Sequence, residues 1–269
     1  MRVIAAVFAC AISGVAANAC EVVDFRTVRL PSGDPIKVAL EVGYPGIKVK
    51  DGEVVFSEED SLPIGEVRTI GPFERLKSAT IAEQFLHPYP LDFDLQSRKT
   101  PWMDPGRLRN DAFFRALYPG GKGKIRASLV KMRYSGLRVK SEFAATSLHC
   151  VHVQLRAALD EAAAIGGHID KFFANPGGSF NWRRVSGTKR LSAHSFGIAI
   201  DVNTELGGYW KWSGAQEGKV FRVRNKIPRE LVEAFERYGF IWGGKWHHYD
   251  GMHFEYRPEL ILYARLRGG

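Results

Sequence analysis

The chain has 269 residues and is basic: 38 lysines and arginines against 29 acidic residues give a formal net charge of +9. Apolar residues make up 45% and aromatic residues 12% of the sequence, which excludes an intrinsically disordered chain and predicts a packed interior. The length allows one large domain or two smaller ones, since domains commonly hold about 50–250 residues. Only one apolar run approaches membrane-spanning length, so a polytopic membrane protein is excluded.

The N-terminus has the pattern of an export signal. Arg2 precedes the apolar run Val3–Ala16, and Ala17-Asn18-Ala19 supplies the small-x-small pattern that signal peptidase accepts. The run is shorter than the roughly 20 residues that a membrane anchor needs. We therefore expect residues 1–19 to be a signal peptide and the protein to be exported to the periplasm or cell envelope. Lipidation of Cys20 is a lesser alternative, because the residues before it match the lipidation pattern poorly.

The cysteines predict one disulfide. Cys10 lies in the expected signal peptide, so Cys20 and Cys150 form an even pair in an oxidising compartment. The alternative is two unrelated thiols, with Cys150 buried in a helix. The cysteine spacings of a zinc ribbon are absent, so the cysteines are not expected to bind metal.

Residues 20–135 carry strand and turn signals but no motif with a recognisable chemistry. Alternating apolar residues in Ile47–Phe56 flank Asp51-Gly52, a dipeptide typical of tight turns, which predicts a β-hairpin. Prolines and glycines divide Leu86–Gly123 into short pieces, one of them a helix around Leu108–Leu117. We interpret this region as an accessory region whose role the sequence leaves open.

A basic run extends from Ala112 to Ser141, where eight basic residues occur without an acidic one. Such a run attracts polyanions. A solvated basic face is the preferred interpretation, because no nucleic-acid-binding motif accompanies the run, and no nucleic-acid partner is expected. Binding to an anionic polymer of the cell envelope is the alternative.

The second half of the chain predicts a regular α+β arrangement. Apolar residues recur at helical spacing in Ser147–Gly167, and a second helix follows Pro228 and ends at Gly239. Another helix is expected after Pro258. We expect a small antiparallel sheet with flanking helices that carries the functional site, preceded by the N-terminal region.

Two separate segments hold candidate metal ligands. In SAHSFGIAIDVN, His194 and Asp201 are seven residues apart, and Gly197 allows a bend before a strand that carries Asp201. In DGMHFEY, Asp250 and His253 are three residues apart beside a turn. Two histidines and one carboxylate suit zinc with a fourth position for water, and Asp250 is then a spare carboxylate that can move the proton of that water.

The same segments resemble a known family. SAHSFGIAID fits the SxHxxGxAxD motif and DGMHFEY the DxxHFE-type motif of the zinc D-alanyl-D-alanine carboxypeptidases. That family includes VanY-type enzymes and the L-alanyl-D-glutamate peptidases of phage lysins, and the resemblance covers about Ser135–Pro258. The resemblance implies one Zn²⁺ with three ligands, His194, Asp201 and His253. It also implies a general base, Asp250.

The resemblance also implies residues that bind substrate. Ser192, the first residue of the motif, corresponds to a position that hydrogen-bonds substrate near the metal. Arg183 falls where relatives place an arginine facing the substrate, with Arg184 and Arg190 as competitors. A guanidinium there can bind a terminal carboxylate or the oxyanion.

Other polar residues beside the motifs receive lesser roles. Glu255 follows the last ligand closely and is expected to support the ligands rather than to react. His247 and His248 lie near Asp250, but the family pattern does not require both, and no role is assigned to them.

The function implied is a zinc-dependent peptidase that hydrolyses peptidoglycan stem peptides, in the first place as a D-alanyl-D-alanine carboxypeptidase. The alternatives are an L-alanyl-D-glutamate endopeptidase, a non-hydrolytic zinc-binding module like the hedgehog domains, and a structural polyanion binder. We expect residues 136–269 to form the peptidase domain. Residues 20–135 are absent from minimal relatives and could cap the cleft, bind glycan, inhibit or stabilise. Neither the oligomeric state nor the bond cut follows from the sequence.

Overall fold

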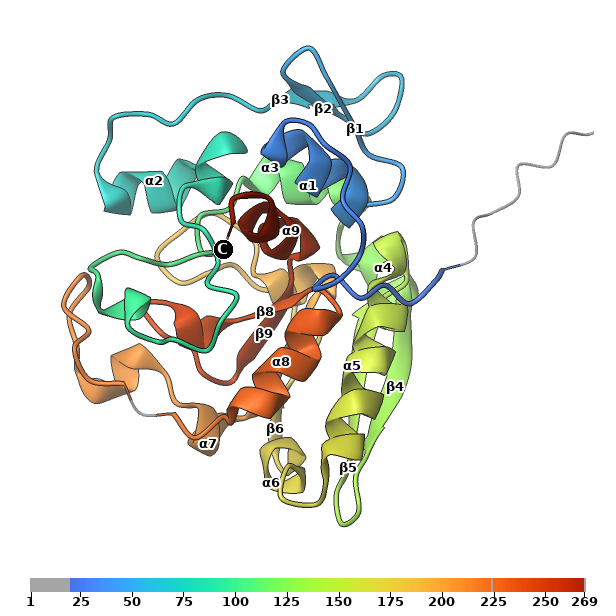
Figure 1. Ribbon diagram of the computed structural model, residues 1–269, viewed down its shortest axis with the longest axis vertical. Coiled ribbons are helices and arrows are strands. Elements are labelled where there is room, and N and C mark those ends of the chain that lie inside the picture. Colours follow the sequence, from blue (N-terminus) through green and yellow to red (C-terminus); the bar gives the residue numbers. More distant parts are fainter. Residues whose placement is uncertain (1–19, 224, 269) are drawn as a thin grey trace, which may run out of the picture.

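The computed structural model describes residues 20–223 and 225–268 (Figure 1). The expected signal peptide, residues 1–19, lies outside them. The chain mixes helices with three small antiparallel sheets, so the α+β prediction is confirmed. Within the described part of the chain, no helix combines the length and apolar character needed to cross a bilayer.

The elements follow one another in short pieces. The α-helices are α1 (Pro35–Gly43), α2 (Pro72–Ser78), α3 (Asp111–Leu117), α4 (Gly121–Ala127), α5 (Val151–Ile165), α6 (Asp170–Phe173), α7 (Thr204–Gly207), α8 (Arg229–Arg237) and α9 (Pro258–Leu266). The strands are β1 (Lys48–Lys50), β2 (Glu53–Val55), β3 (Ser61–Pro63), β4 (Leu129–Ser135), β5 (Lys140–Thr146), β6 (Pro176–Gly178), β7 (Ala199–Asn203), β8 (Phe240–Trp242) and β9 (His253–Tyr256). Short 3₁₀ turns are η1 (Ala82–Phe85), η2 (Ser97–Lys99), η3 (Leu148–Cys150), η4 (Ala193–Phe196), η5 (Trp210–Ser213) and η6 (Gly243–Lys245).

The predicted hairpin is confirmed in the N-terminal region. Strands β1 and β2 pair antiparallel, with Val49 opposite Val54, and both side chains are buried. Asp51 and Gly52 at the turn have φ angles of 51° and 78°, which short polar residues and glycine tolerate best. β3 adds to the other edge of β2, giving a three-stranded sheet.

The sheet that carries the site has the order β6-β7-β9-β8 and is antiparallel throughout. Helix α8 begins after Pro228 and packs on this sheet, where Phe235 contacts Phe254 with ring centroids 4.4 Å apart (Figure 1). The helix ends before Gly239, whose φ of 87° reverses the chain into β8. Both ends are as predicted, and α9 follows Pro258 as expected.

Helix α5 starts later than the apolar periodicity predicts. His149 and Cys150 have φ angles of 48° and 60°, so Leu148–Cys150 forms a separate 3₁₀ turn and α5 begins at Val151. Cys150 is disulfide-bonded to Cys20 across a Cα–Cα distance of 5.5 Å, which confirms the predicted pair. A sulfur bonded in this way cannot carry a lipid, so the structure does not favour lipidation of Cys20.

The N-terminal region and the second half share one hydrophobic core. The Tyr44 ring contacts both Phe113 and Tyr256 edge-on, and its hydroxyl donates a 2.6 Å hydrogen bond to Glu259. Helix α1 packs along α9 (Figure 1). The β4–β5 hairpin pairs residues on both sides of position 135. A boundary at residue 135 between an accessory region and a peptidase domain therefore remains a prediction about the roles of the two regions.

The basic run lies on the surface. Its eight lysine and arginine side chains are all exposed; they belong to α3, α4 and the β4–β5 hairpin and are Arg115, Lys122, Lys124, Arg126, Lys131, Arg133, Arg138 and Lys140. Their exposure agrees with a solvated basic face.

Candidate metal centre

Three elements of the second half bring the candidate ligands together. His194 lies in the 3₁₀ turn η4, Asp201 on β7, and His253 at the start of β9. Asp201 and His253 are direct cross-strand partners, so their side chains project from the same face of the sheet. Gly197, with a φ of 68°, reverses the chain between η4 and β7 and places His194 beside them. The bend predicted at this glycine is confirmed.

The three side chains form a group that can hold a metal ion. Each offers one ligand atom, and these atoms lie within 4.8 Å of one another. His194 Nε2 is 3.2 Å from one carboxylate oxygen of Asp201, and His253 Nδ1 is 3.0 Å from the other. Two imidazoles and one carboxylate are a ligand set that suits zinc.

The hydrogen bonds around the histidines fit this role. His194 Nδ1 donates to the carbonyl of Ser179, which leaves the lone pair on Nε2; this atom is buried and has no hydrogen-bond partner among the described residues. His253 Nε2 is 3.2 Å from Glu255 Oε2, so Nδ1 faces Asp201. Each ring thus has one nitrogen oriented by an outer partner and one directed at the group, as metal-ligating histidines usually do.

The charges of the group support cation binding. Burial raises the pKa of Asp201, but the close contacts and charges of His194 and His253 outweigh this effect and hold the pKa well below its usual range. Burial lowers the pKa of His253, yet its contacts with Asp201 and Glu255 raise it to about 10. The carboxylates therefore attract a positive charge at His253, and a metal cation can take the place of that proton.

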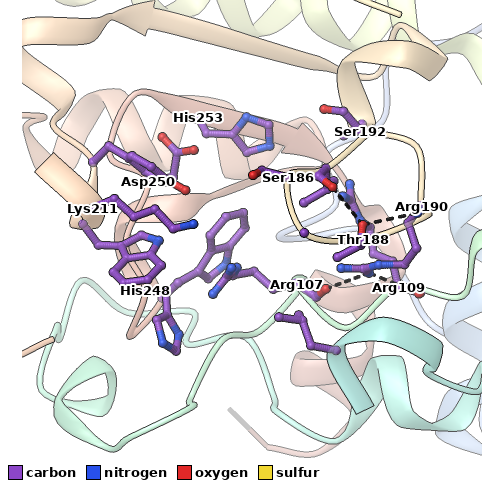
Figure 2. Close-up of a pocket in the computed structure, with 18 of the residues that line it drawn as sticks. Arg107, Arg109, Ser186, Thr188, Arg190, Ser192, Lys211, His248, Asp250 and His253 are labelled. Atoms are coloured by element: carbon purple, nitrogen blue, oxygen red, sulfur yellow. Dashed lines mark hydrogen bonds between the residues drawn. The ribbon is translucent and has the colours of Figure 1, made fainter. Parts of the chain in front are cut away.

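Asp250 lies beside the ligands without pairing to them. Its Oδ1 is buried and lacks a hydrogen-bond partner in the described structure, and Figure 2 shows its carboxyl group next to His253. Burial raises its pKa to about 6, and the Asp201 charge acts in the same direction, against opposing charges from His253, His194 and Arg107. A carboxyl group with this pKa can accept and return a proton near neutral pH.

A cavity of about 540 Å³ opens in front of this group. Ser192 and Arg183 line it, as expected of substrate-binding residues, and so does the buried Arg190. Arg184, by contrast, is not among the lining residues. Thus two of the three competing arginines face the cavity, Arg183 exposed and Arg190 buried.

His247 and His248 hold loops together. His247 Nδ1 donates to the carbonyl of Arg98 at 2.8 Å, and its Nε2 accepts from the amide of Val220 at 3.3 Å. His248 Nδ1 donates to Asp104 at 2.6 Å, and its Nε2 accepts from Gly218. Both rings have both nitrogens engaged, so neither has a free nitrogen for substrate.

Sequence reasoning expected Glu255 to support the ligands but missed the arginines that pair with it. Glu255 accepts from His253 and pairs with Arg109 at 3.1 Å and Arg257 at 3.4 Å. Burial raises the pKa of Glu255, but these two arginines and His253 hold it far below its usual range. Arg109 belongs to the N-terminal region, where no local pattern marks it.

A comparison with known protein families finds a match in the segment that holds the candidate ligands. Residues 186–256 match the family model described as D-alanyl-D-alanine carboxypeptidase. The matched segment contains all three candidate ligands and Asp250, and it confirms the resemblance drawn from the two motifs. No curated protein and no solved structure matches the chain.

Proposed function

We propose that this chain, whose residues 186–256 match the model of the D-alanyl-D-alanine carboxypeptidase family, is a zinc-dependent peptidase that hydrolyses peptidoglycan stem peptides. One observation carries the proposal. His194 Nε2, which is buried and has no hydrogen-bond partner among the described residues, lies with Asp201 and His253 in the lining of a cavity. The same lining includes Asp250, whose Oδ1 likewise has no partner in the described part of the chain.

His194, Asp201 and His253 would hold one Zn²⁺, which supplies Lewis-acid polarisation of the scissile carbonyl and lowers the pKa of water when bound. The Ser179 carbonyl and Glu255 keep the two imidazoles in the orientation that binding requires. These outer contacts restrict ring rotation before metal arrives, which lowers the entropic cost of assembling the site.

Asp250 acts as the general base. In the carboxylate form it accepts a proton from the attacking water, and as a carboxylic acid it returns that proton to the departing amine. Its pKa of about 6 leaves most molecules in the basic form at neutral pH. Because Oδ1 has no hydrogen-bond partner among the described residues, this oxygen is available to the water.

Ser192 and Arg183 bind the peptide. Both line the cavity, and no side-chain hydrogen bond engages the Arg183 guanidinium within the described chain. A guanidinium can bind a carboxylate through two parallel hydrogen bonds or stabilise the negative oxygen that forms during amide hydrolysis. The cavity volume suits a short peptide segment.

The charge of the cavity favours action at a peptide end. Six cationic side chains line it, namely Lys77, Arg107, Arg109, Arg183, Arg190 and Lys211, against the four acids Asp201, Glu217, Asp250 and Glu255. Arg109 pairs with Glu255 and Arg107 with Asp104, which leaves Lys77, Arg183, Arg190 and Lys211 without an ion pair among the described residues. A terminal carboxylate would complement these cations, which supports D-alanyl-D-alanine carboxypeptidase action over endopeptidase action.

The location fits the substrate. The disulfide between Cys20 and Cys150 is typical of an oxidising compartment, and residues 1–19 have the pattern of a signal peptide. Export to the periplasm or cell envelope would bring the protein to peptidoglycan.

The test is mass spectrometry of defined muropeptides after incubation with metal-replete protein. Loss of the terminal D-alanine identifies a carboxypeptidase, whereas cleavage between L-alanine and D-glutamate identifies the endopeptidase. Asp250→Asn serves as the matched variant, because it should retain zinc and lose hydrolysis. Wild-type protein that holds zinc but cleaves no stem peptide would instead support a non-hydrolytic module.

A further inference from the structure

A segment of the N-terminal region forms one wall of the cavity. Gly106, Arg107 and Arg109 line it together with residues of the second half. Figure 2 shows Arg107 and Arg109 beside Arg190, joined to it by hydrogen bonds. No motif in the sequence pointed to this segment, Asp104–Arg109.

Buried arginines of the second half fix the backbone of this segment. Arg190 Nη1 donates to the carbonyls of Arg107 and Arg109, at 3.1 and 3.3 Å. Arg257 Nη1 donates to the carbonyl of Gly106 at 2.9 Å. Gly106 has a φ of 101°, a conformation that favours glycine, and a Cβ there would lie 2.3 Å from Ile241 Cδ1. The segment is therefore held in one position.

The first residue of the segment is fixed as firmly. Asp104 is buried, accepts the backbone N–H of His248 at 2.8 Å, and accepts from the His248 ring at 2.6 Å. Burial raises the pKa of Asp104, but the Arg107 charge and the contacts with His248 lower it to about 2, so it stays ionised. A wall built with this many charged contacts is preorganised for a ligand.

Arg107 itself is lightly engaged. Its only side-chain hydrogen bond in the described structure is a long one, 3.3 Å from Nη1 to Asp104, and its side chain remains 19% exposed. Its charge also acts on Asp250 and Tyr209, which both line the same cavity. The guanidinium thus has N–H groups left to donate on the side where a substrate would lie.

Two of the three arginines of this wall have an acidic partner, because Arg107 pairs with Asp104 and Arg109 with Glu255, whereas Arg190 makes no ion pair with a described residue. Arg190 is 5% exposed and its Nε has no hydrogen-bond partner among the described residues. Burial and the charges of Arg109 and Arg107 lower the pKa of Arg190 to about 9. Glu255 pairs with Arg109 at 3.1 Å, and Arg257, which lies 3.4 Å from Glu255, has its closer partner in Glu259. A bound anion would relieve the repulsion among these guanidinium groups.

We propose that Asp104–Arg109 is part of the substrate site and that Arg107 binds a carboxylate of the peptide substrate. This inference rests on the proposed peptidase function and extends it, because the N-terminal region then contributes to specificity. The carboxylate belongs either to the C-terminus of the peptide or to an acidic residue within it. Both have the same chemistry, and the experiment separates them.

The test compares Arg107→Gln with wild type on three peptides of one sequence. The first has free carboxylates, the second an amidated C-terminus, and the third an amidated internal acidic residue. One of the amidated peptides should reduce wild-type kcat/KM roughly 10- to 100-fold, as expected for a charge-assisted hydrogen bond. In Arg107→Gln that same discrimination should disappear, and the peptide concerned identifies the carboxylate.

Arg133→Gln is the matched control, because Arg133 is an exposed arginine on the β4–β5 hairpin and is not part of the cavity. It should discriminate as wild type does. If Arg107→Gln also discriminates as wild type does, the proposal is wrong.

A binding measurement separates this outcome from failure of the proposed function. Calorimetry on the metal-loaded protein would use ketomethylene analogues of the peptides, which cannot be hydrolysed. Weaker binding of an amidated analogue to wild type, absent in Arg107→Gln, supports the carboxylate site even if no peptide is cleaved. Equal binding of all analogues to wild type would overturn it.

Discussion

The two regions of the molecule contribute to the cavity in different ways. The second half supplies the candidate ligands and Asp250, on two paired strands and the turn before them. The N-terminal region supplies a wall and part of the core, with Tyr44 and Phe113 packed towards Tyr256. The comparison shows that the candidate reactive residues come from one half of the sequence, whereas the walls that shape the cavity come from both halves.

The first prediction tests whether the second half is independent of the N-terminal region. A chain of residues 136–269 alone should not fold cooperatively, because it lacks Tyr44 and Phe113 and the Gly106 segment packed on Ile241. Each large buried side chain removed costs about 3–5 kcal/mol, and whole domains are stable by only about 5–15 kcal/mol. Near-ultraviolet circular dichroism during thermal unfolding measures the outcome. A sharp transition would establish residue 135 as a folding boundary.

The second prediction concerns the metal group. His194→Ala should lose bound zinc and reduce kcat/KM roughly 1,000-fold or more, because metal chemistry supplies several kcal/mol of transition-state stabilisation. His168→Ala is the control, since His168 is an exposed histidine paired with Glu230 at the surface. Metal content by mass spectrometry and hydrolysis of a stem peptide are measured on both. Full zinc occupancy in His194→Ala would remove it from the ligand set.

The metal group shows how far sequence reasoning reaches. Gly197 and the β-branched residues after it indicate a turn followed by a strand, and that local order is sufficient to place His194 next to Asp201. The pairing of β7 with β9 brings His253 to the same place. The two motifs predict that His253 joins the group, whereas the periodicity of the sequence alone does not.

The wall of the cavity shows where sequence reasoning ends. Arg107 and Arg109 acquire their positions from Arg190, 83 and 81 residues away, while Arg257 holds Gly106 over a separation of 151 residues. No local pattern encodes hydrogen bonds between segments so distant. The late start of α5 has a similar cause, because the positive φ angles of His149 and Cys150 accompany a disulfide to the N-terminus.

The third prediction tests the covalent link between the two regions. Replacing both Cys20 and Cys150 by serine should lower the free energy of unfolding by roughly 2–5 kcal/mol, since the bond closes a loop of 130 residues. Zinc content should not change, because neither cysteine lies in the metal group. Denaturant titration of both proteins gives the value. An unchanged midpoint would mean that the shared core alone holds the N-terminus.

The fourth prediction compares two adjacent arginines. Arg183→Ala should retain zinc and lower kcat/KM roughly 10- to 100-fold, because it removes a charged hydrogen bond to substrate. Arg184→Ala should have little effect, since Arg184 does not line the cavity. Steady-state kinetics on one stem peptide measure both. If turnover of Arg183→Ala equals that of wild type, Arg183 has no part in binding.

The smallest effect expected is on pH dependence. Asp250 must be ionised to accept a proton, and its pKa of about 6 predicts that kcat/KM rises with pH through an acidic limb centred near or below 6. A bound cation favours the carboxylate further and shifts the limb towards lower pH. Below the limb, the rate should fall about tenfold per pH unit, because one proton blocks one base.

Metal content measured at each pH separates this titration from protonation of the ligands, which would release zinc together with activity. A limb that follows metal loss would assign the pH dependence to the imidazoles, and the base role of Asp250 would then rest on Asp250→Asn alone.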